Sequence, residues 1–248
     1  MADTMKYLGG KQRIAKKIAA HLERVRPAGA PFFDVFAGGL SVTAATTGER
    51  VANDACLPLI NMYRAYATGW RPPLVLSEET YQELKSKQDP DDPLTAFAGF
   101  GCSFSGKWFG GYARSWAKPG TLTQISKDYP GAVPISMAAA AARGLARKAA
   151  AIEASTFFAG DFTDLVIPDG ALVYVDPEYR DVERYGFFRE PFPHARFDAW
   201  VAALARRCVV LGSEYRPRSP AWVEIDAWHK VGSMAASPKT ERLFAVRG

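Results

Sequence analysis

The spacing of apolar residues divides the chain into two regularly patterned regions with an irregular region between them. The first predicted helix spans 11–25, where apolar residues recur every three or four positions. After it the pattern predicts, in order, a strand over 31–36, a helix over 40–47, a strand over 50–52 and a helix over 55–68. Such alternation of strands and helices favours a parallel sheet with helices packed on it.

This alternation stops at residue 71. Residues 71–134 are rich in Pro, Gly, Lys and aromatic residues and show no clean period. An Ala-rich helix over 136–153 closes this region, with Arg143 and Arg147 one turn apart on one face. We therefore predict one domain built from 1–70 and 151–248, interrupted by an inserted, mainly helical subdomain over 71–150.

The regular pattern then resumes. It predicts strands over 156–159, 171–175 and 208–212, a helix over 192–206, and a terminal antiparallel pair over 223–225 and 243–246. Distinctive residues follow five of the predicted strands, at 37–39, 53–54, 161, 176–179 and 213–215. In open α/β sheets, ligands bind beyond the carboxyl ends of the strands, so we expect the functional residues to meet at that edge.

The composition narrows the class of protein. The 248 residues are 48% hydrophobic and carry a formal net charge of +5, which is ordinary for a globular protein and weakly favours polyanionic partners. Three widely separated cysteines suggest reduced thiols and a cytoplasmic location. We expect no membrane span, and the scattered histidines and absence of paired-cysteine motifs predict no metal site.

Residues 176–179 read Asp-Pro-Glu-Tyr, directly after a predicted buried strand. Asp176 can accept a hydrogen bond from an amine, and Pro177 fixes the turn with its carbonyl pointing outward. Tyr179 offers a flat face on which a base can stack.

Three further features have both a functional and a structural interpretation. The loop over 34–39 has small residues that allow close approach to a ligand, or it is an ordinary tight turn. Asp54 is placed to accept both hydroxyls of a ribose, or it caps the next helix. Lys11 opens a predicted helix, where the helix dipole disfavours a cation, so a local anion such as a ligand carboxylate would resolve the mismatch.

Taken in order along the chain, these motifs resemble those of the Dam-type DNA adenine-N6 methyltransferase family, whose tetrad is Asp-Pro-Pro-Tyr. The resemblance covers about residues 5–70 and 155–215, and Glu178 departs from the family tetrad. It implies a Rossmann-like S-adenosylmethionine-dependent methyltransferase fold. It also implies a catalytic group of Asp176, Pro177 and Tyr179, and a cofactor site of Tyr7, Lys11, Phe36, Gly38, Gly39, Asp54, Asp161 and Asp176.

The family resemblance further implies that the insertion recognises the target. Its basic candidates for DNA contact are Lys107, Arg114, Arg143 and Arg147, and the alternative is a small satellite core with incidental charges. The implied reaction moves a methyl group from S-adenosylmethionine to N6 of an adenine flipped out of double-stranded DNA. The resemblance implies a monomeric enzyme in the cytoplasm of a bacterial or phage-infected host cell.

Other functions remain open at this stage. The chain could be a catalytically impaired relative that binds DNA or cofactor, or it could methylate RNA or a small molecule. Glu178 allows three outcomes. It points to solvent or pairs with Arg180 or Arg184 and leaves activity intact, it impairs catalysis, or it suits a modified sulfonium donor or another acceptor.

Overall fold

The structure is a computed structural model that describes residues 5, 7, 9–118, 120, 124–180, 187–188, 190–229 and 240–248. The chain divides into two compact units, which are described separately. The first comprises 1–10, 56–154 and 185–189, and the second comprises 11–55, 155–184 and 190–248.

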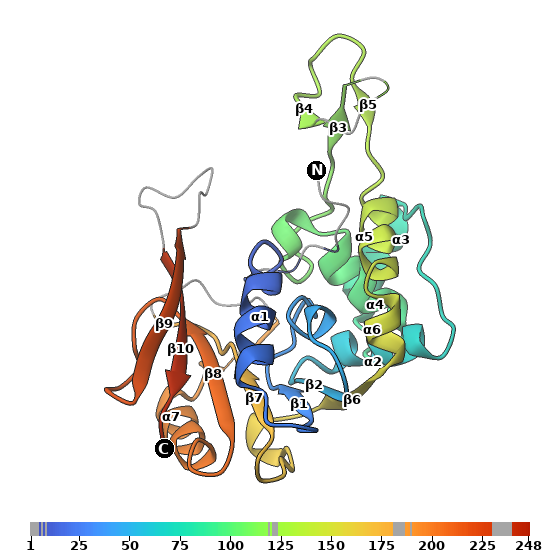
Figure 1. The fold of residues 1–248 in the computed structure, drawn as a ribbon. Helices are drawn as coiled ribbons and strands as arrows, with labels where there is room; N and C mark the ends of the chain where they lie inside the picture. Colours follow the sequence, from blue (N-terminus) through green and yellow to red (C-terminus); the bar gives the residue numbers. More distant parts are fainter. Residues whose placement is uncertain are drawn as a thin grey trace. The chain divides into compact units, whose positions relative to one another are not determined.

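The second unit is built on a seven-stranded sheet with the order β6-β2-β1-β7-β8-β10-β9 (Figure 1). Its strands are β1 (Phe32–Asp34), β2 (Arg50–Asp54), β6 (Ser155–Ala159), β7 (Leu172–Val175), β8 (Val209–Glu214), β9 (Trp222–His229) and β10 (Thr240–Val246). The first five strands in the spatial order are parallel, whereas β10 runs antiparallel to both β8 and β9. The predicted Rossmann-like α/β fold is thus confirmed, as is the terminal antiparallel pair.

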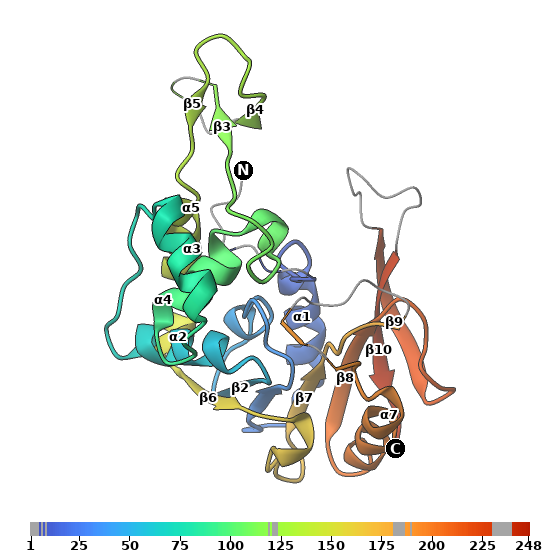
Figure 2. The same ribbon diagram turned by 180° about the vertical axis from the view of Figure 1, so that it is seen from behind.

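The sheet has a helix on each face, seen from both sides in Figures 1 and 2. Successive strand residues point to opposite faces, and Phe32 and Phe33 therefore enter different apolar clusters. Phe32 packs with residues of α1 (Ala15–Val25), and Phe33 packs with residues of α7 (His194–Leu204). Burial of both faces accounts for the near-continuous apolar sequence of the central strands.

The first unit is mainly helical. Its helices are α2 (Leu57–Ala67), α3 (Glu78–Lys87), α4 (Pro93–Ala96), α5 (Met137–Ala146) and α6 (Ala149–Glu153). A small sheet of β3 (Trp116–Ala117), β4 (Gln124–Ile125) and β5 (Val133–Pro134) stands at one end of this unit, beyond α3 and α5 (Figure 2). The predicted insertion over 71–150 lies within this unit.

The helix predicted over 40–47 is wrong: the structure has only a 3₁₀ turn at Thr43–Ala45. Leu40 adopts a positive φ of 58°, which is incompatible with a regular helix at that point. The Thr43 hydroxyl donates to Asp34 and the Thr46 hydroxyl to the Thr43 carbonyl. These side-chain bonds compete with helical backbone bonds, so the apolar spacing was misleading here.

Two other predicted elements have different limits. The helix predicted over 136–153 is divided into α5 and α6, because the Lys148 N–H bonds to the Leu145 carbonyl three residues back and tightens the turn. The strand predicted over 208–212 continues to Glu214, so Ser213 and Glu214 lie in β8 rather than in a loop.

Candidate active site

Acidic residues gather at one edge of the seven-stranded sheet. Asp34 and Asp54 end β1 and β2, Asp176 follows β7, and Glu214 ends β8. These strands are parallel, so their carboxyl ends share an edge. β10 is antiparallel and begins at that same edge, with Arg242 paired to Glu214, which brings in Glu241. The connections diverge between β1 and β7, the switch point where such sheets bind ligands.

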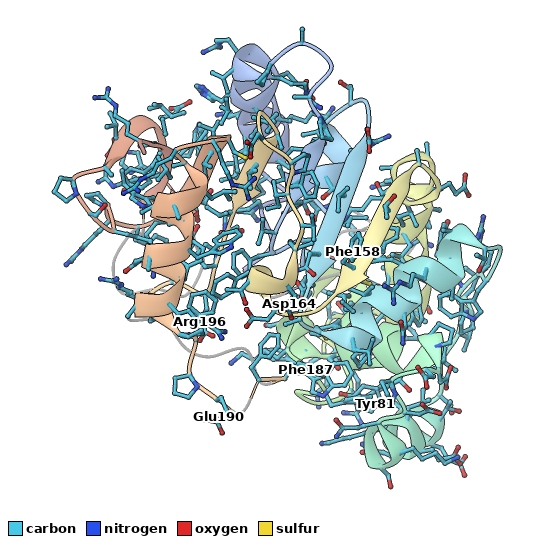
Figure 3. The ribbon with its side chains drawn as sticks, turned by 90° about the horizontal axis from the view of Figure 1, so that it is seen from below. Tyr81, Phe158, Asp164, Phe187, Glu190 and Arg196 are labelled. Carbon is cyan, nitrogen blue, oxygen red and sulfur yellow. The ribbon has the colours of Figure 1, made fainter. Side chains whose placement is uncertain are left out.

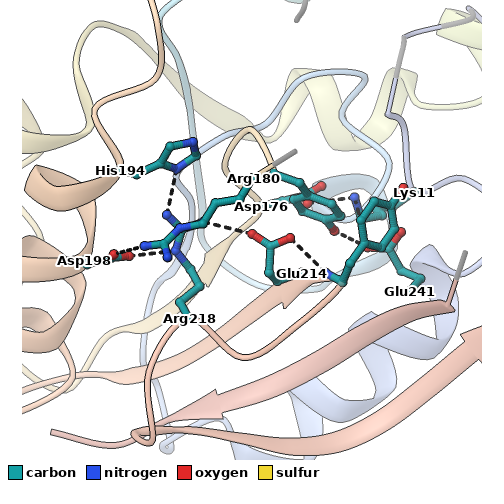
Figure 4. A network of polar contacts seen from close by, with 10 residues as sticks. Lys11, Asp176, Arg180, His194, Asp198, Glu214, Arg218 and Glu241 are labelled. Carbon is teal, nitrogen blue, oxygen red and sulfur yellow. Dashed lines mark hydrogen bonds and ion pairs between the residues drawn. The ribbon is translucent and has the colours of Figure 1, made fainter. Parts of the chain in front are cut away.

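Lys11 is a buried cation at this edge. Its Nζ lies 2.7 Å from Oδ1 of Asp176 and 3.4 Å from Oε1 of Glu241 (Figure 4). It also lies 4.8 Å from the centroid of the Tyr179 ring, whose hydroxyl donates to Glu241. Lys11 precedes α1 by a turn rather than opening it. The mismatch expected for a helix-start cation is therefore resolved by carboxylates of the protein itself.

The charge of Asp176 depends on these neighbours. Burial raises the pKa of its carboxyl, Lys11 opposes that increase, and Glu241 adds to it. Burial also raises the pKa of Tyr179 far above its usual range, so its hydroxyl remains a donor. The geometry therefore places a carboxylate with one charged partner beside an aromatic ring, which suits recognition of an uncharged amine on a flat ring.

The loop after β1 is tied to the end of β2. The Gly38 N–H donates to Oδ2 of Asp54 at 2.9 Å, and Gly38 has a positive φ of 43°. The side-chain amide of Asn53 donates to the Val35 carbonyl at 3.0 Å. The N-cap position of α2 is Cys56, two residues after Asp54. The Asp54 carboxylate holds the glycine loop through the Gly38 N–H.

Asp34 is the least compensated acid at this edge. It is 2% exposed, and its Oδ2 accepts the Thr43 hydroxyl at 2.6 Å. Among the described residues, its Oδ1 is buried without a hydrogen-bond partner. Burial raises its pKa to about 7, Thr43 opposes the shift, and Asp176 and Asp54 add to it. Sequence analysis placed Asp34 at the start of the loop motif but did not assign it to the site.

This edge fits a cationic ligand. Four carboxylates lie at this edge, and the Lys11 ammonium contacts two of them, those of Asp176 and Glu241. The other two belong to Asp34 and Asp54, which are buried. An excess of buried negative charge is unfavourable unless a cation compensates it. S-adenosylmethionine carries both a sulfonium and an ammonium, so the residues at this edge match its charge. Lys11, Gly38, Asp54 and Asp176 are among the predicted cofactor residues that lie at this edge.

Asp161 and Phe36 have protein partners of their own. Asp161 accepts the N–H and hydroxyl of Thr163 and forms an ion pair with Arg196, from the first turn of α7 (Figure 3). Partial burial would raise the pKa of Asp161, but the Thr163 bonds and Arg196 lower it overall. Phe36 packs against Phe162 at 5.8 Å between ring centroids. Asp161 therefore caps the 3₁₀ turn Phe162–Asp164. A bound adenine would have to share the Asp161 carboxylate with Arg196.

A second polar cluster lies beside the tetrad, with His194 and Asp198 at the left of Figure 4. Arg218 bonds to Glu214 at 2.9 Å, to Asp198 at 2.7 Å and to His194 at 2.8 Å. Asp198 also pairs with Arg180, directly after the tetrad. Burial raises the pKa of Glu214 to about 7, opposed by the Tyr215 N–H and Arg218. This cluster links α7 and β8 to the chain that leaves Tyr179.

Glu178 is half-buried, and one predicted partner is already engaged because Arg180 pairs with Asp198. The other predicted partner, Arg184, lies outside the described residues.

The remaining predicted residues belong to the first unit. Tyr7 packs against Phe100, with ring centroids 5.0 Å apart. Arg114 is exposed and pairs with Glu78, and Lys107 is half-buried. Arg143 on α5 and Arg147 at its C-cap are exposed, and the Arg147 N–H donates a hydrogen bond of 3.1 Å to the Arg143 carbonyl.

Sequence analysis missed Glu241 altogether. The predicted terminal strand began at Leu243, three residues after the observed start of β10 at Thr240. Glu241 is in phase with Leu243, and an acid at an inward-facing strand position could have revealed it.

In the parts of the chain that the structure describes, no group of three or more His, Cys, Asp or Glu residues is arranged to hold a metal ion. Nor does any helix there have the length and apolar character needed to cross a membrane.

Comparison with known proteins points to methyl transfer. Residues 7–94 match the family model of the D12 class N6 adenine-specific DNA methyltransferases. This segment contains Tyr7, Lys11, Gly38 and Asp54 but ends before the tetrad. The match supports methyl transfer as the chemistry, of the kind that uses S-adenosylmethionine.

Two solved structures resemble the chain distantly. One is yhhF from Escherichia coli, described as a methyltransferase, with 10% identity and a TM-score of 0.36 over 98% of this chain and 90% of that one. The other is described as a methylase from Haemophilus influenzae, with 9% identity and a TM-score of 0.34 over 95% of this chain and 98% of that one. At these values neither likeness bears on substrate or mechanism.

Proposed function

We propose that the protein transfers a methyl group from S-adenosylmethionine to N6 of an adenine that is flipped out of double-stranded DNA. The observation that carries the proposal is the position of Asp176 and Tyr179: they follow the buried strand β7 at the switch point, with Lys11 2.7 Å from Asp176. The match of residues 7–94 to an adenine-specific family supports adenine as the acceptor.

The amine acceptors are Asp176 and the carbonyl of Pro177. Adenine N6 is a weak nucleophile because its lone pair is delocalised into the ring, and acceptance of both N6 hydrogens favours a more pyramidal nitrogen. S-adenosylmethionine, when bound, supplies an electrophilic methyl group on a sulfonium. The protein's part is orientation and electrostatic stabilisation. Lys11 favours the ionised form of Asp176, because it opposes the increase in pKa that burial causes.

Tyr179 provides the stacking surface for the flipped base. Lys11 lies over its ring, and Tyr215 meets it edge-on, with centroids 4.7 Å apart and planes at 80°. Tyr179 is 8% exposed, so a stacked base has to displace a neighbouring group. Tyr215 is the neighbour whose movement would uncover the ring while the Tyr179 hydroxyl stays on Glu241. Stacking on an aromatic ring is worth about 1–3 kcal/mol per base.

The cofactor would be held by Lys11, Phe36, Gly38, Gly39, Asp54 and Asp176, with Tyr7 and Asp161 as further candidates. DNA would be held through the first unit, where the exposed Arg114, Arg143 and Arg147 and the half-buried Lys107 are the candidate phosphate contacts.

The deciding experiment is mass spectrometry of nucleosides from DNA incubated with the protein and S-adenosylmethionine. We expect N6-methyladenine from the wild type and none from Asp176→Ala, with Asp164→Ala, an exposed acid of the same unit, as the matched control. Cofactor binding without any modified base would instead identify a non-catalytic relative. A modified base other than N6-methyladenine would overturn the assigned donor or acceptor.

A further inference from the structure

Glu241 is a carboxylate at a strand position that this fold would otherwise give to an apolar side chain. It is 0% exposed and lies two residues before Leu243, so the two side chains share a face of the sheet. Leu243 belongs to the apolar cluster beneath α1. A buried carboxylate is costly unless its partners or its role compensate for it. The partners of Glu241 therefore indicate its role.

Those partners are two groups of the candidate active site. The Tyr179 hydroxyl donates to Glu241, and the Lys11 ammonium lies 3.4 Å away (Figure 4). The same ammonium contacts Asp176 at 2.7 Å and lies over the Tyr179 ring. One carboxylate from β10 is thus joined to both groups that flank the acceptor carboxylate.

Each contact has a distinct physical effect. A bond to the hydroxyl fixes the tilt of the Tyr179 ring, because it holds the ring at the end farthest from the backbone. The contact with Lys11 draws the ammonium toward a second carboxylate. A lysine paired with Asp176 alone would compete with an incoming amine for the same oxygens.

We propose that Glu241 is a positioning residue of the methyl-transfer site: it holds Tyr179 by its hydroxyl and shares the Lys11 ammonium with Asp176, so that ring and carboxylate are oriented before adenine binds. This inference rests on the proposed function. Glu241 contacts neither adenine nor the methyl donor in this arrangement and acts through its two partners.

The electrostatics of Asp176 give the inference a specific signature. The titratable groups that face Asp176 are Lys11 before α1, Asp34 on β1, Tyr174 on β7, Tyr179 in the tetrad, Glu214 on β8 and Glu241 on β10. Asp176 and Glu241 share the ammonium, so their oxygens lie within about 6 Å, where carboxylates raise each other's pKa. Loss of the Glu241 charge therefore lowers the pKa of Asp176, and exclusive pairing with Lys11 acts in the same direction.

The first test is the pH dependence of methylation by Glu241→Gln, which keeps the shape and removes the charge. We expect kcat to fall about 10- to 100-fold, as for a misplaced reacting group. The KM for S-adenosylmethionine should change by less than about twofold. The acidic limb of the plot of kcat against pH should move to lower pH by about one unit. The control is Glu224→Gln on β9, which breaks an exposed ion pair with Arg242 in the same sheet. An equal loss of activity at every pH, or no loss, would overturn the positioning role.

The second test measures the hydroxyl contact without any reaction. A double-mutant cycle combines Tyr179→Phe with Glu241→Leu, and unfolding equilibria are measured for all four proteins. We expect the unfolding equilibrium constant of the double variant to differ by at least about fivefold from the value for two independent changes. The reason is that either single change leaves a buried polar partner unsatisfied. Additive effects would overturn the contact. If the wild type does not methylate adenine, the proposed function and the positioning role fall together, whereas an active wild type with an unmoved acidic limb overturns the positioning role alone.

Discussion

Replacement of Asp34 by Asn should stabilise the protein at alkaline pH. The carboxyl of Asp34 is 2% exposed, and burial raises its pKa from 3.8 to about 7. Between these values the unfolded chain has released the proton and the native protein has not, so stability falls as pH rises. A shift of about three units corresponds to a loss of about 4 kcal/mol, complete above pH 7. Asn keeps an acceptor for the Thr43 hydroxyl and cannot ionise.

The assay is urea denaturation of wild type and Asp34→Asn at pH 4, 6 and 8, followed as the difference in unfolding free energy. That difference cancels the contributions that are the same in both proteins, including those of the other unit. We expect it to be small at pH 4 and to grow to about 4 kcal/mol in favour of the variant at pH 8. Asp164→Asn, at an exposed position, should show no such growth. A difference that stays flat from pH 4 to 8 would refute the reasoning that Asp34 is an uncompensated buried acid.

Three further outcomes follow from the proposed function. Asp54→Ala should weaken S-adenosylmethionine binding by about 1–3 kcal/mol in isothermal titration, and unchanged affinity would remove Asp54 from the site. Glu178→Pro restores the family tetrad and should retain or raise N6-methyladenine formation; complete loss would assign the carboxylate a catalytic or donor-selecting role. Each lost phosphate contact should lower the slope of log affinity for DNA against log salt concentration by about 0.9. An unchanged slope after Ala substitution at all four candidate positions would place the DNA surface elsewhere. The four positions are Lys107, Arg114, Arg143 and Arg147.

The sheet was predictable because its central strands are buried on both faces. Residues 171–175 and 31–36 are nearly continuous apolar runs, and β7 and β1 lie within them, although β1 is shorter than predicted. The segment over 40–47 was mispredicted because its threonines form local side-chain bonds that apolar spacing does not report. Propensity alone cannot weigh such bonds against a helix.

The site was predictable only where the acid follows its strand directly. Asp54 and Asp176 come at the carboxyl ends of parallel strands, so their meeting at one edge follows from the fold class alone. Glu241 comes from an antiparallel strand, which reverses the rule and delivers its first residues to that edge. Its pairing with Lys11 joins residues that are distant in sequence, and no local pattern encodes such a contact.

The position of β10 in the sheet has a consequence for the order in which the sheet is completed during synthesis. β10 lies between β8 and β9 in the sheet, yet it is the last of the three to leave the ribosome. Until it has emerged, β8 and β9 have no strand between them, and Lys11 and Asp176 have no second carboxylate beside them. Contacts of such long sequence separation close late, because the loop entropy must be overcome first. Completion of the candidate site should therefore wait until β10 has been synthesised.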